Sequence, residues 1–368
     1  MPSELMYQIA LTQVPMIGDV TIRKLLDHFP TATAIFQARR HELERIEQVG
    51  SARAAAIKDF TDFREVEQEL RFIEENNIQV IFYGDEKYPG RLRTCLDAPA
   101  LLYFRGNASL NAGRMVSIVG TRQPSAYGIR ICEQLVKELC SNGVTIVSGL
   151  AYGVDVLAHA TAVAAKAPTI GVLAHGLDRM YPAAHSHIAA SMEQCGGLLT
   201  EYPRHTPPDK QHFPRRNRIV AGLADATIVI ESGMKGGSLI TAAMAGAYNR
   251  DVFCFPGRAG EWYSAGCHEL IRKNKAVLIT CAADVMNAMG WERTSVSPVA
   301  GRQPSLFVEL SPEERTIMQL FQQNKQLHLE DIYVLSRLSG SQIAVAVFNL
   351  EMQCLVRCLP GQIYEPVI

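Results

Sequence analysis

The sequence predicts an α/β protein built around a parallel sheet that is covered by helices on both faces. Between residues 78 and 280, short apolar runs rich in β-branched residues alternate with alanine-rich stretches of helical composition. The runs are apolar at successive positions, which is typical of strands buried on both faces of a parallel sheet. The alternation predicts a core domain over residues 76–290. The runs are IQVIFYG, MVSIVG, VTIVSG, PTIGVLA, GLLTE, ATIVIES, DVFCFPG and AVLIT, and the helical stretches cover 126–141, 153–166, 183–195 and 238–249.

Residues 1–75 form the first predicted domain, and their pattern is helical. Two segments repeat the same order of apolar residues, glycine and helix: VPMIGDVTIRKLL at 14–26 and IEQVGSARAAAIKDF at 46–60. Gly18 and Gly50 stand where a tight turn between helices needs a residue that tolerates unusual dihedral angles. Paired turns of this kind resemble helix-hairpin-helix motifs, whose backbone amides hold nucleic-acid phosphates, but a small helical bundle uses the same turn for packing. Both interpretations stay open at this point.

The C-terminal region is predicted to be a linker followed by a small domain. Residues 291–310 are rich in Ser, Pro and Gly and lack a helical period, which is typical of a linker. The capping signal SPEE then opens a domain over 311–368, with helices expected at 312–323, 328–336 and 341–352 and a hairpin that turns at the sequence PG. Three helices and a hairpin suggest a winged-helix domain.

The charge of this small domain argues against reading of duplex DNA. Residues 311–368 contain four Lys/Arg against six Asp/Glu, and the expected recognition helix, SGSQIAVAVFNLEMQ, contains no cation. A winged helix that enters a DNA groove normally carries cations on that helix. We therefore expect a protein contact or an accessory role.

Composition limits the classes of function that are open to the chain. It has 368 residues, a net charge of -1 and a pI near 6.8, so a polyanion would have to be bound by a local patch. The nine cysteines form no C-x-x-C pair and match no zinc spacing, which favours buried thiols in a reducing compartment. We find no secretion signal and no apolar run of about 20 residues. A soluble, cytoplasmic protein without a metal or cofactor is expected.

Ligand sites in such sheets lie at the carboxyl ends of the strands, so the loops that follow the strands are the first places to search. The first loop, VGTRQPSAYG, fits neither a dinucleotide-binding nor a P-loop pattern. Its Gly120, Thr121 and Arg122 end a buried strand just before a helix, and the guanidinium of Arg122 suits a phosphate or, alternatively, a carboxylate at the sheet edge. The second loop, SGLAYGVD, supplies Ser148 and Gly149 for close approach to a ligand. We interpret its Asp155 as a carboxylate that complements the helix dipole.

The third loop, ESGMKGGSLITAAMA, contains Lys235, Gly236, Gly237 and Ser238 at the start of a helix. Consecutive backbone amides at such a start form an anion-binding nest, and Lys235 adds positive charge. A role in packing alone would not explain the Gly-Gly-Ser sequence, so anion binding is favoured.

The fourth segment is KQHFPRRNR, at the entrance of a further helix. Residues 204–218 contain five Lys/Arg against the one acid Asp209. An aromatic ring among cations is typical of a single-strand nucleic-acid site, where stacking contributes about 1–3 kcal/mol per base. Phe213 could instead pack under the loop as a hydrophobic staple, and Asn217 could bind a base edge or cap local backbone. The candidate residues in this segment are Lys210, Phe213, Arg215, Asn217 and Arg218.

Taken together and in this order, five motifs resemble the DprA/Smf family of DNA-processing proteins. They are SIVGTRQPSAYG, IVSGLAYGVDVLAH, FPRRNRIVAGLADATIVIES, KGGSLITAAMA and VFCFPG, and they span about 78–289. The resemblance implies an extended Rossmann-like core that forms homodimers, binds single-stranded DNA and loads the RecA recombinase during natural transformation. It also implies a SAM-like or hairpin-helix domain before the core and a winged helix after it. The family's arginine of the Gly-Thr-Arg motif falls on Arg122, and its basic and aromatic residues fall on Lys210 and Phe213.

The resemblance further implies that the core has no established catalysis. The strand-end loops contain neither a nucleophile–base pair nor a set of metal ligands, and His175, His185 and His187 are expected to be structural or close to DNA. Two alternatives share the phosphate loops. One is a phosphoribohydrolase-like enzyme, which is disfavoured because TAAMAGAY, after the Gly-Gly-Ser turn, lacks an acid. The other is a nucleotide sensor or scaffold, which the sequence leaves open.

Overall fold

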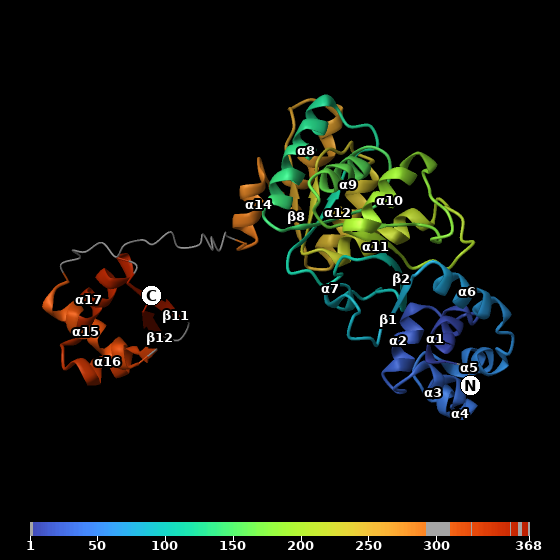
Figure 1. Ribbon diagram of the computed structural model, residues 1–368, viewed down its shortest axis with the longest axis horizontal. Helices are drawn as coiled ribbons and strands as arrows, with labels where there is room; N and C mark the ends of the chain where they lie inside the picture. The colour runs from blue at the N-terminus through green and yellow to red at the C-terminus, as the bar shows by residue number, and fades with distance from the viewer. Residues whose placement is uncertain (1–2, 292–309, 325, 354, 360–362, 367–368) are drawn as a thin grey trace. The chain divides into compact units, whose positions relative to one another are not determined.

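The computed structural model describes residues 3–291 and 310–366, apart from 325, 354 and 360–362. Almost all of the expected linker and the expected hairpin turn at 360–361 lie outside the described residues. The chain divides into two compact units, Met1–Arg293 and Thr294–Ile368, which are coloured from blue to orange and in red in Figure 1. None of the described helices is both long enough and apolar enough to cross a membrane.

A nine-stranded sheet forms the centre of the first unit. Its strand order is β1-β2-β6-β5-β4-β3-β7-β8-β9, and the strands from β6 to β9 run parallel. The strands are β1 (Gln79–Phe82), β2 (Leu101–Gly106), β3 (Met115–Val119), β4 (Thr145–Ser148), β5 (Thr169–Val172), β6 (Gly197–Thr200), β7 (Ala226–Val229), β8 (Asp251–Cys254) and β9 (Val277–Leu278).

The expectation of an all-parallel sheet is wrong at one edge. β2 pairs antiparallel with both β1 and β6, and no strand was expected at its sequence LLYFRG. β1 and β2 are joined through the one-turn helix α7 (Gly90–Arg93), so their connection does not make the crossover that a parallel pair requires. An apolar run reveals that a strand is buried but not the direction in which it runs.

Helices cover both faces of the sheet, as the sequence predicts. One buried cluster joins the sheet to α8 (Ala126–Ser141), α9 (Val154–Ala164) and α14 (Ala282–Ala288). The opposite cluster joins it to α7, α11 (His212–Leu223), α12 (Gly237–Ala247) and α13 (Ala265–Arg272). The short helices η1 (Ala183–His185) and η2 (Trp262–Ser264) precede α10 (Ser186–Cys195) and α13. Because β3 to β7 are buried along their whole length, the loops beyond their ends carry the residues that a ligand can reach.

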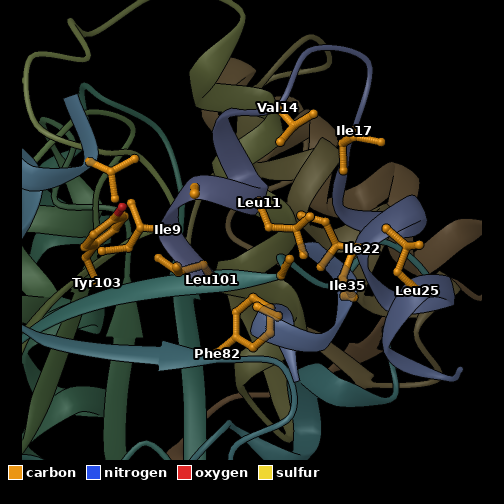
Figure 2. Close-up of a cluster of buried hydrophobic side chains, with 14 of the residues drawn as sticks. Ile9, Leu11, Val14, Ile17, Ile22, Leu25, Ile35, Phe82, Leu101 and Tyr103 are labelled. Carbon is orange, nitrogen blue, oxygen red and sulfur yellow. The ribbon is translucent and has the colours of Figure 1, made fainter. Parts of the chain in front are cut away.

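The N-terminal helices pack against the antiparallel edge of this sheet. Figure 2 shows Ile9 and Leu11 of the first helix beside Leu101 and Tyr103 of β2, and Leu25 farther along the same cluster, near Ile22. This contact makes the helical region part of the first compact unit. The helices are α1 (Glu4–Gln13), α2 (Asp19–Leu26), α3 (Ala32–Gln37), α4 (Arg40–Glu44), α5 (Gly50–Asp59) and α6 (Arg64–Glu75).

The two repeated turns differ in their backbone. Gly50 has φ +62, in the region that favours glycine. Gly18 has φ -109 and is the N-cap of α2, so the expectation of an unusual dihedral angle there is wrong. In that turn Met16 takes the positive φ of 65 instead.

The second unit contains three helices and a small antiparallel sheet. Ser311 and Glu314 form a capping box at the start of α15 (Pro312–Gln323), which is followed by α16 (Leu329–Ser336) and α17 (Gly340–Met352). These bounds agree with the predicted helices to within one residue. The sheet has the order β10-β12-β11, and β10 (Leu327–His328) was not predicted beside the hairpin of β11 (Val356–Leu359) and β12 (Ile363–Pro366).

Candidate functional site

The order of the strands places a crevice at the carboxyl ends of β3 and β7. From β3 the chain builds β4, β5 and β6 on one side and later β7, β8 and β9 on the other. Ligands bind at such switch points because the loops that follow the two central strands diverge there. A cavity of about 600 Å³ lies at this point. It is lined by eleven of the predicted site residues: Gly120, Thr121, Arg122, Gly149, Lys210, Phe213, Asn217, Lys235, Gly236, Gly237 and Ser238.

The loop after β3 is held in a fixed position by the start of α9. Gly153 has φ +80, and a Cβ built on it would lie 2.3 Å from the carbonyl oxygen of Thr121. Glycine is therefore needed both for the dihedral angle and for the close approach of the two backbones. The loop presents Arg122 as an exposed side chain whose guanidinium carbon is 5.8 Å from the centroid of the Phe213 ring, a distance typical of a cation–π contact.

The helix that follows this loop contributes less than its position suggests. Glu231, at the end of β7, accepts hydrogen bonds from the backbone amide of Ser125 (2.9 Å) and from its Oγ (2.5 Å). Ser125 is the N-cap of α8. Because a buried carboxylate of the protein already occupies this helix start, α8 offers little to an external anion, and the anion site of this loop rests on Arg122.

The loop after β4 makes room for a buried arginine that sequence analysis did not select. Arg216 is 4% exposed, and its Nη1 donates hydrogen bonds to the carbonyl oxygens of Gly149 (2.5 Å) and Val172. A Cβ on Gly149 would lie 2.4 Å from the guanidinium, so glycine is required there. Burial lowers the pKa of Arg216 to about 10, and the side chain stays charged at neutral pH.

Two further residues of this loop have different surroundings. Ser148 is fully buried, and its Oγ donates to the carbonyl oxygen of Ile118 at 2.5 Å, so it lies outside the cavity and the expectation that it faces a ligand is wrong. Asp155 lies in the first turn of α9, where the sequence placed it, and it also lines the cavity. Burial raises the pKa of its carboxyl, and the positive charge of Arg216 opposes this rise.

Helix α11 directs its cations toward two different sides. Helical periodicity puts residues three and four apart on one face, so Phe213, Arg216 and Asn217 share the side that lines the cavity. Arg215 and Arg218 lie on another side, which lines a separate groove. The expectation that these two arginines face the strand ends is therefore wrong.

Arg215 and Arg218 hold the helical region to the core. Arg215 Nη2 is 3.1 Å from the Asp19 carboxylate, at the start of α2, and 3.0 Å from the Glu201 carboxylate after β6. Arg218 pairs with the same two acids and donates to the carbonyl of Asp97. Burial raises the pKa of Glu201, while the two arginines oppose this shift. Helical periodicity predicts that Arg215 and Arg218 lie on the same side of the helix. The neighbouring sequence does not show that this side faces two acids.

The loop after β7 provides an uncapped helix start. Within the described part of the chain, no side chain caps the start of α12 at Gly236. A Cβ on Gly236 would lie 2.2 Å from Ser232 Oγ, so glycine lets the loop fold tightly, while Ser238 Oγ donates to Ser232 Oγ at 2.9 Å. Gly236, Gly237 and Ser238 at this helix start line the cavity, beside the exposed Lys235. Uncapped amides and a helix dipole at this position suit an anion.

Aromatic side chains also line the cavity. The ring of Tyr181 lies 5.9 Å from that of Phe213 at an interplanar angle of 51°, and Trp262 lines the cavity as well. Neither Tyr181 nor Trp262 was selected from sequence, because neither belongs to a glycine-rich or cationic motif. For Tyr181 the available signal was an aromatic residue in the connection after the apolar run PTIGVLA, in LDRMYPAAH.

The histidines belong to the supporting structure. His175 Nδ1 lies 2.9 Å from the carbonyl oxygen of Gly176, and His185 Nδ1 lies 2.9 Å from that of Leu150. Both side chains are buried, whereas His187 is exposed and does not line the cavity. Among the residues that the structure describes, no cluster of His, Cys, Asp or Glu is arranged to hold a metal ion.

Comparison with known proteins identifies the family. Residues 79–290 match the family described as DNA recombination-mediator protein A. The chain belongs to this family, also named DprA/Smf. It is 30% identical to protein Smf of Synechocystis over 99% of both chains, and 39% identical to DNA processing protein DprA of Bacillus subtilis over 64% of this chain and 80% of that protein.

Two solved DprA structures share the fold. The X-ray structure of DprA from Streptococcus pneumoniae is 32% identical, with a TM-score of 0.68 over 77% of this chain and 97% of that chain. DprA from Helicobacter pylori is also 32% identical, with a TM-score of 0.53 over 58% of this chain and 96% of that chain, and its structure concerns a single-stranded DNA binding mode. The mixed α/β core with a large, mostly parallel sheet is thus the DprA core.

Proposed function

We propose that this chain binds single-stranded DNA in the cavity at the ends of β3 and β7 and acts there as a recombination mediator. The observation that carries this proposal is the convergence of positive charge from separate segments. Among the described residues that line the cavity, Arg122, Lys210, Arg216 and Lys235 are cationic and Asp155 is acidic. A chain with a net charge of -1 thereby concentrates a positive field at one crevice. The single-strand binding described for the H. pylori DprA supports the same ligand.

The residues of the cavity would contact different parts of a DNA single strand, its phosphates and its bases. Arg122, Lys210 and Lys235 would contact phosphates as charges, and the first amides of α12 would hold one phosphate by hydrogen bonds. The face of Phe213 would stack on a base. A ring inside a cavity is accessible to an unpaired base but not to one stacked within a duplex, so single strands are favoured. Because stacking and phosphate contacts do not depend on base identity, little sequence preference is expected.

The wider role and the assembly form part of the same proposal. We propose that the chain forms a homodimer through the core, protects incoming single strands during natural transformation, loads the RecA recombinase onto them and has no catalytic activity. The edge strand β9 supports a contact between cores, since its Val277 and Leu278 are 56% and 46% exposed, and exposed apolar edge strands pair readily with another chain.

The flanking regions are assigned by their elements. We propose that residues 1–75 are a SAM-like or helix-hairpin-helix-like domain, that 76–290 are a Rossmann-like core, that 291–310 are a linker and that 311–368 are a winged-helix domain. On α17 of that last domain Val345, Phe348 and Met352 are 62%, 61% and 71% exposed. Exposed apolar side chains on a helix that has no cations favour contact with a protein over contact with DNA.

A gel-shift comparison of single- and double-stranded oligonucleotides tests the proposed function. We expect the single strand to be bound more tightly. The double variant Arg122→Glu, Lys210→Glu is expected to lose binding to oligo-dT and to keep its circular-dichroism spectrum. Lys137→Glu serves as a matched control, because Lys137 is an exposed cation on α8 that does not line the cavity. Unchanged affinity of the double variant would refute the site, and a RecA strand-exchange assay on the bound strand then tests loading.

A further inference from the structure

The loop between β8 and α13 places an exposed tryptophan on the rim of the cavity. Trp262 is 68% exposed and lines the cavity together with Lys235 and Ile240. The motif VFCFPG ends at Gly257, and the residues between Gly257 and Ser264 belong to none of the sequence motifs.

The indole is anchored along one side. A Cβ built on Gly233 would lie 3.0 Å from Cζ2 of Trp262, so the six-membered ring rests against the backbone of Gly233. The ring of Tyr263 meets it edge to face at 5.3 Å and 81°. Both contacts restrict the orientation of the indole, yet about two thirds of the residue remains in contact with solvent.

Packing within the protein does not account for this placement. Tryptophan can bury about 150–250 Å² of surface, and its placement in a folded protein normally uses much of that area. Here the neighbouring Ile240 is also 45% exposed, and the two apolar side chains border the uncapped start of α12. An apolar surface beside a phosphate site has the chemistry of a nucleotide site, where a base stacks on a ring while its phosphate meets backbone amides.

We infer that Trp262 is a second stacking platform, which receives a base of the single strand whose phosphate lies at the start of α12. This inference rests on the proposed function and extends it from one base contact to two. Phe213 lies over the ends of β3 and β4, because its neighbours are Arg122 after β3 and Arg216, which is bonded to Gly149 after β4. Trp262 follows β8.

The spacing of the strands shows that the two rings serve different nucleotides. The indole rests on Gly233, which follows β7, and β7 stands one position from β3 and two from β4 in the sheet. Neighbouring strands lie about 4.8 Å apart, so the two platforms are about 5–10 Å apart. Successive bases on a stacked strand are separated by about 3.4 Å. The bound strand therefore runs across the switch point, from α11 over α12 to the loop after β8.

Tryptophan fluorescence provides a direct test without changing Trp262. The chain contains two tryptophans, and the other, Trp291, is partly buried against the core cluster beneath α14. In a Trp291→Phe variant, emission reports on Trp262. We expect oligo-dT to quench it in proportion to the bound fraction, which is measured independently by the anisotropy of a labelled oligonucleotide. A strand of abasic sugar-phosphate should bind through its phosphates with little quenching.

Substitution of Trp262 provides the second arm. Trp262→Ala is expected to weaken oligo-dT binding about 5- to 150-fold, whereas Trp262→Phe should retain most of the affinity. Leu96→Ala is the control, because Leu96 is 87% exposed and does not line the cavity. Tight binding with unchanged emission, or unchanged affinity of Trp262→Ala, would overturn the inference while leaving the proposed function intact. Absence of any oligo-dT binding by the unmodified chain would overturn both.

Discussion

Neutralising two cations of the cavity should change the salt dependence of DNA binding by a calculable amount. Arg122 and Lys210 are exposed and line the cavity from two different segments. In the double variant Arg122→Gln, Lys210→Gln, both side chains stay polar and similar in reach, so the main change is the loss of charge. Lys235 keeps its charge, and Arg216 is already engaged with the carbonyls of Gly149 and Val172.

The magnitude follows from counterion release. For single strands, the slope of log K against log salt is about -0.7 per phosphate that is neutralised. With Arg122, Lys210 and Lys235 facing the strand, the parent slope should be about -2, and the double variant should show about -0.7. If parent and variant bind equally at 1 M salt, the loss of two charges lowers log K for DNA binding by about 1.4 at 0.1 M salt. That difference is about 25-fold in affinity, or about 2 kcal/mol.

The assay is the fluorescence anisotropy of a labelled oligo-dT across a salt series from 0.05 M to 0.5 M, a range of about one decade. The curves of parent and variant should converge as salt rises, since the missing contribution is electrostatic. Lys137→Gln should leave the slope unchanged. A double variant that loses affinity equally at all salt concentrations would show that the side chains do not contact phosphates. A mononucleotide site would instead give a shallow slope in the parent as well.

Three other perturbations test separate parts of the structure. Phe213→Ala should weaken oligo-dT binding by about 1–3 kcal/mol with an unchanged salt slope, measured by the same titration. Gly153→Ala, at φ +80 and 2.3 Å from the Thr121 carbonyl oxygen, should lower the free energy of unfolding by about 1–3 kcal/mol in urea titrations, whereas Gly246→Ala, which meets open space, should not. Burial lowers the pKa of His159 to about 3. In the unfolded chain the imidazole of His159 is protonated near pH 6.5, whereas in the folded chain it stays neutral down to about pH 3. The free energy of unfolding should therefore fall by about 2 kcal/mol between pH 7 and pH 5. His159→Gln should flatten that decline, and an equally steep decline in the variant would assign it to other groups.

The convergence at the switch point could be predicted from sequence because it depends on a rule about sheets. Parallel strands end at one edge, so loops that are far apart in the chain meet there. Arg122 and Gly236 are more than a hundred residues apart, and both line one cavity. The strands themselves could be found because burial on both faces leaves a continuous apolar run. Neither step requires knowledge of which residues touch.

What could not be predicted depends on contacts between distant residues. The antiparallel direction of β2 is set by its pairing with β1 and β6 and cannot be inferred from its own sequence, LLYFRG. Ser148 looks like a polar loop residue, but its hydroxyl completes a hydrogen bond inside the sheet. Trp262 starts the one-turn helix η2 in a connection without sequence periodicity, and only its contact with Gly233 and its exposure single it out.

Helix α11 shows why a count of cations overstates the charge that a ligand meets. Arg215 and Arg218 pair with Asp19 and Glu201, so their charges are largely balanced before DNA arrives. Breaking a buried pair is strongly destabilising, by about 3–5 kcal/mol, which means that a strand cannot easily recruit Arg218 away from its acids. The pairing nevertheless serves the cavity, because a helix fixed on one side has a fixed rotation about its axis. With that rotation set, Phe213 must face the cavity, three residues before the buried Arg216. The two arginines that pair with acids thereby orient the ring that we propose stacks on a base.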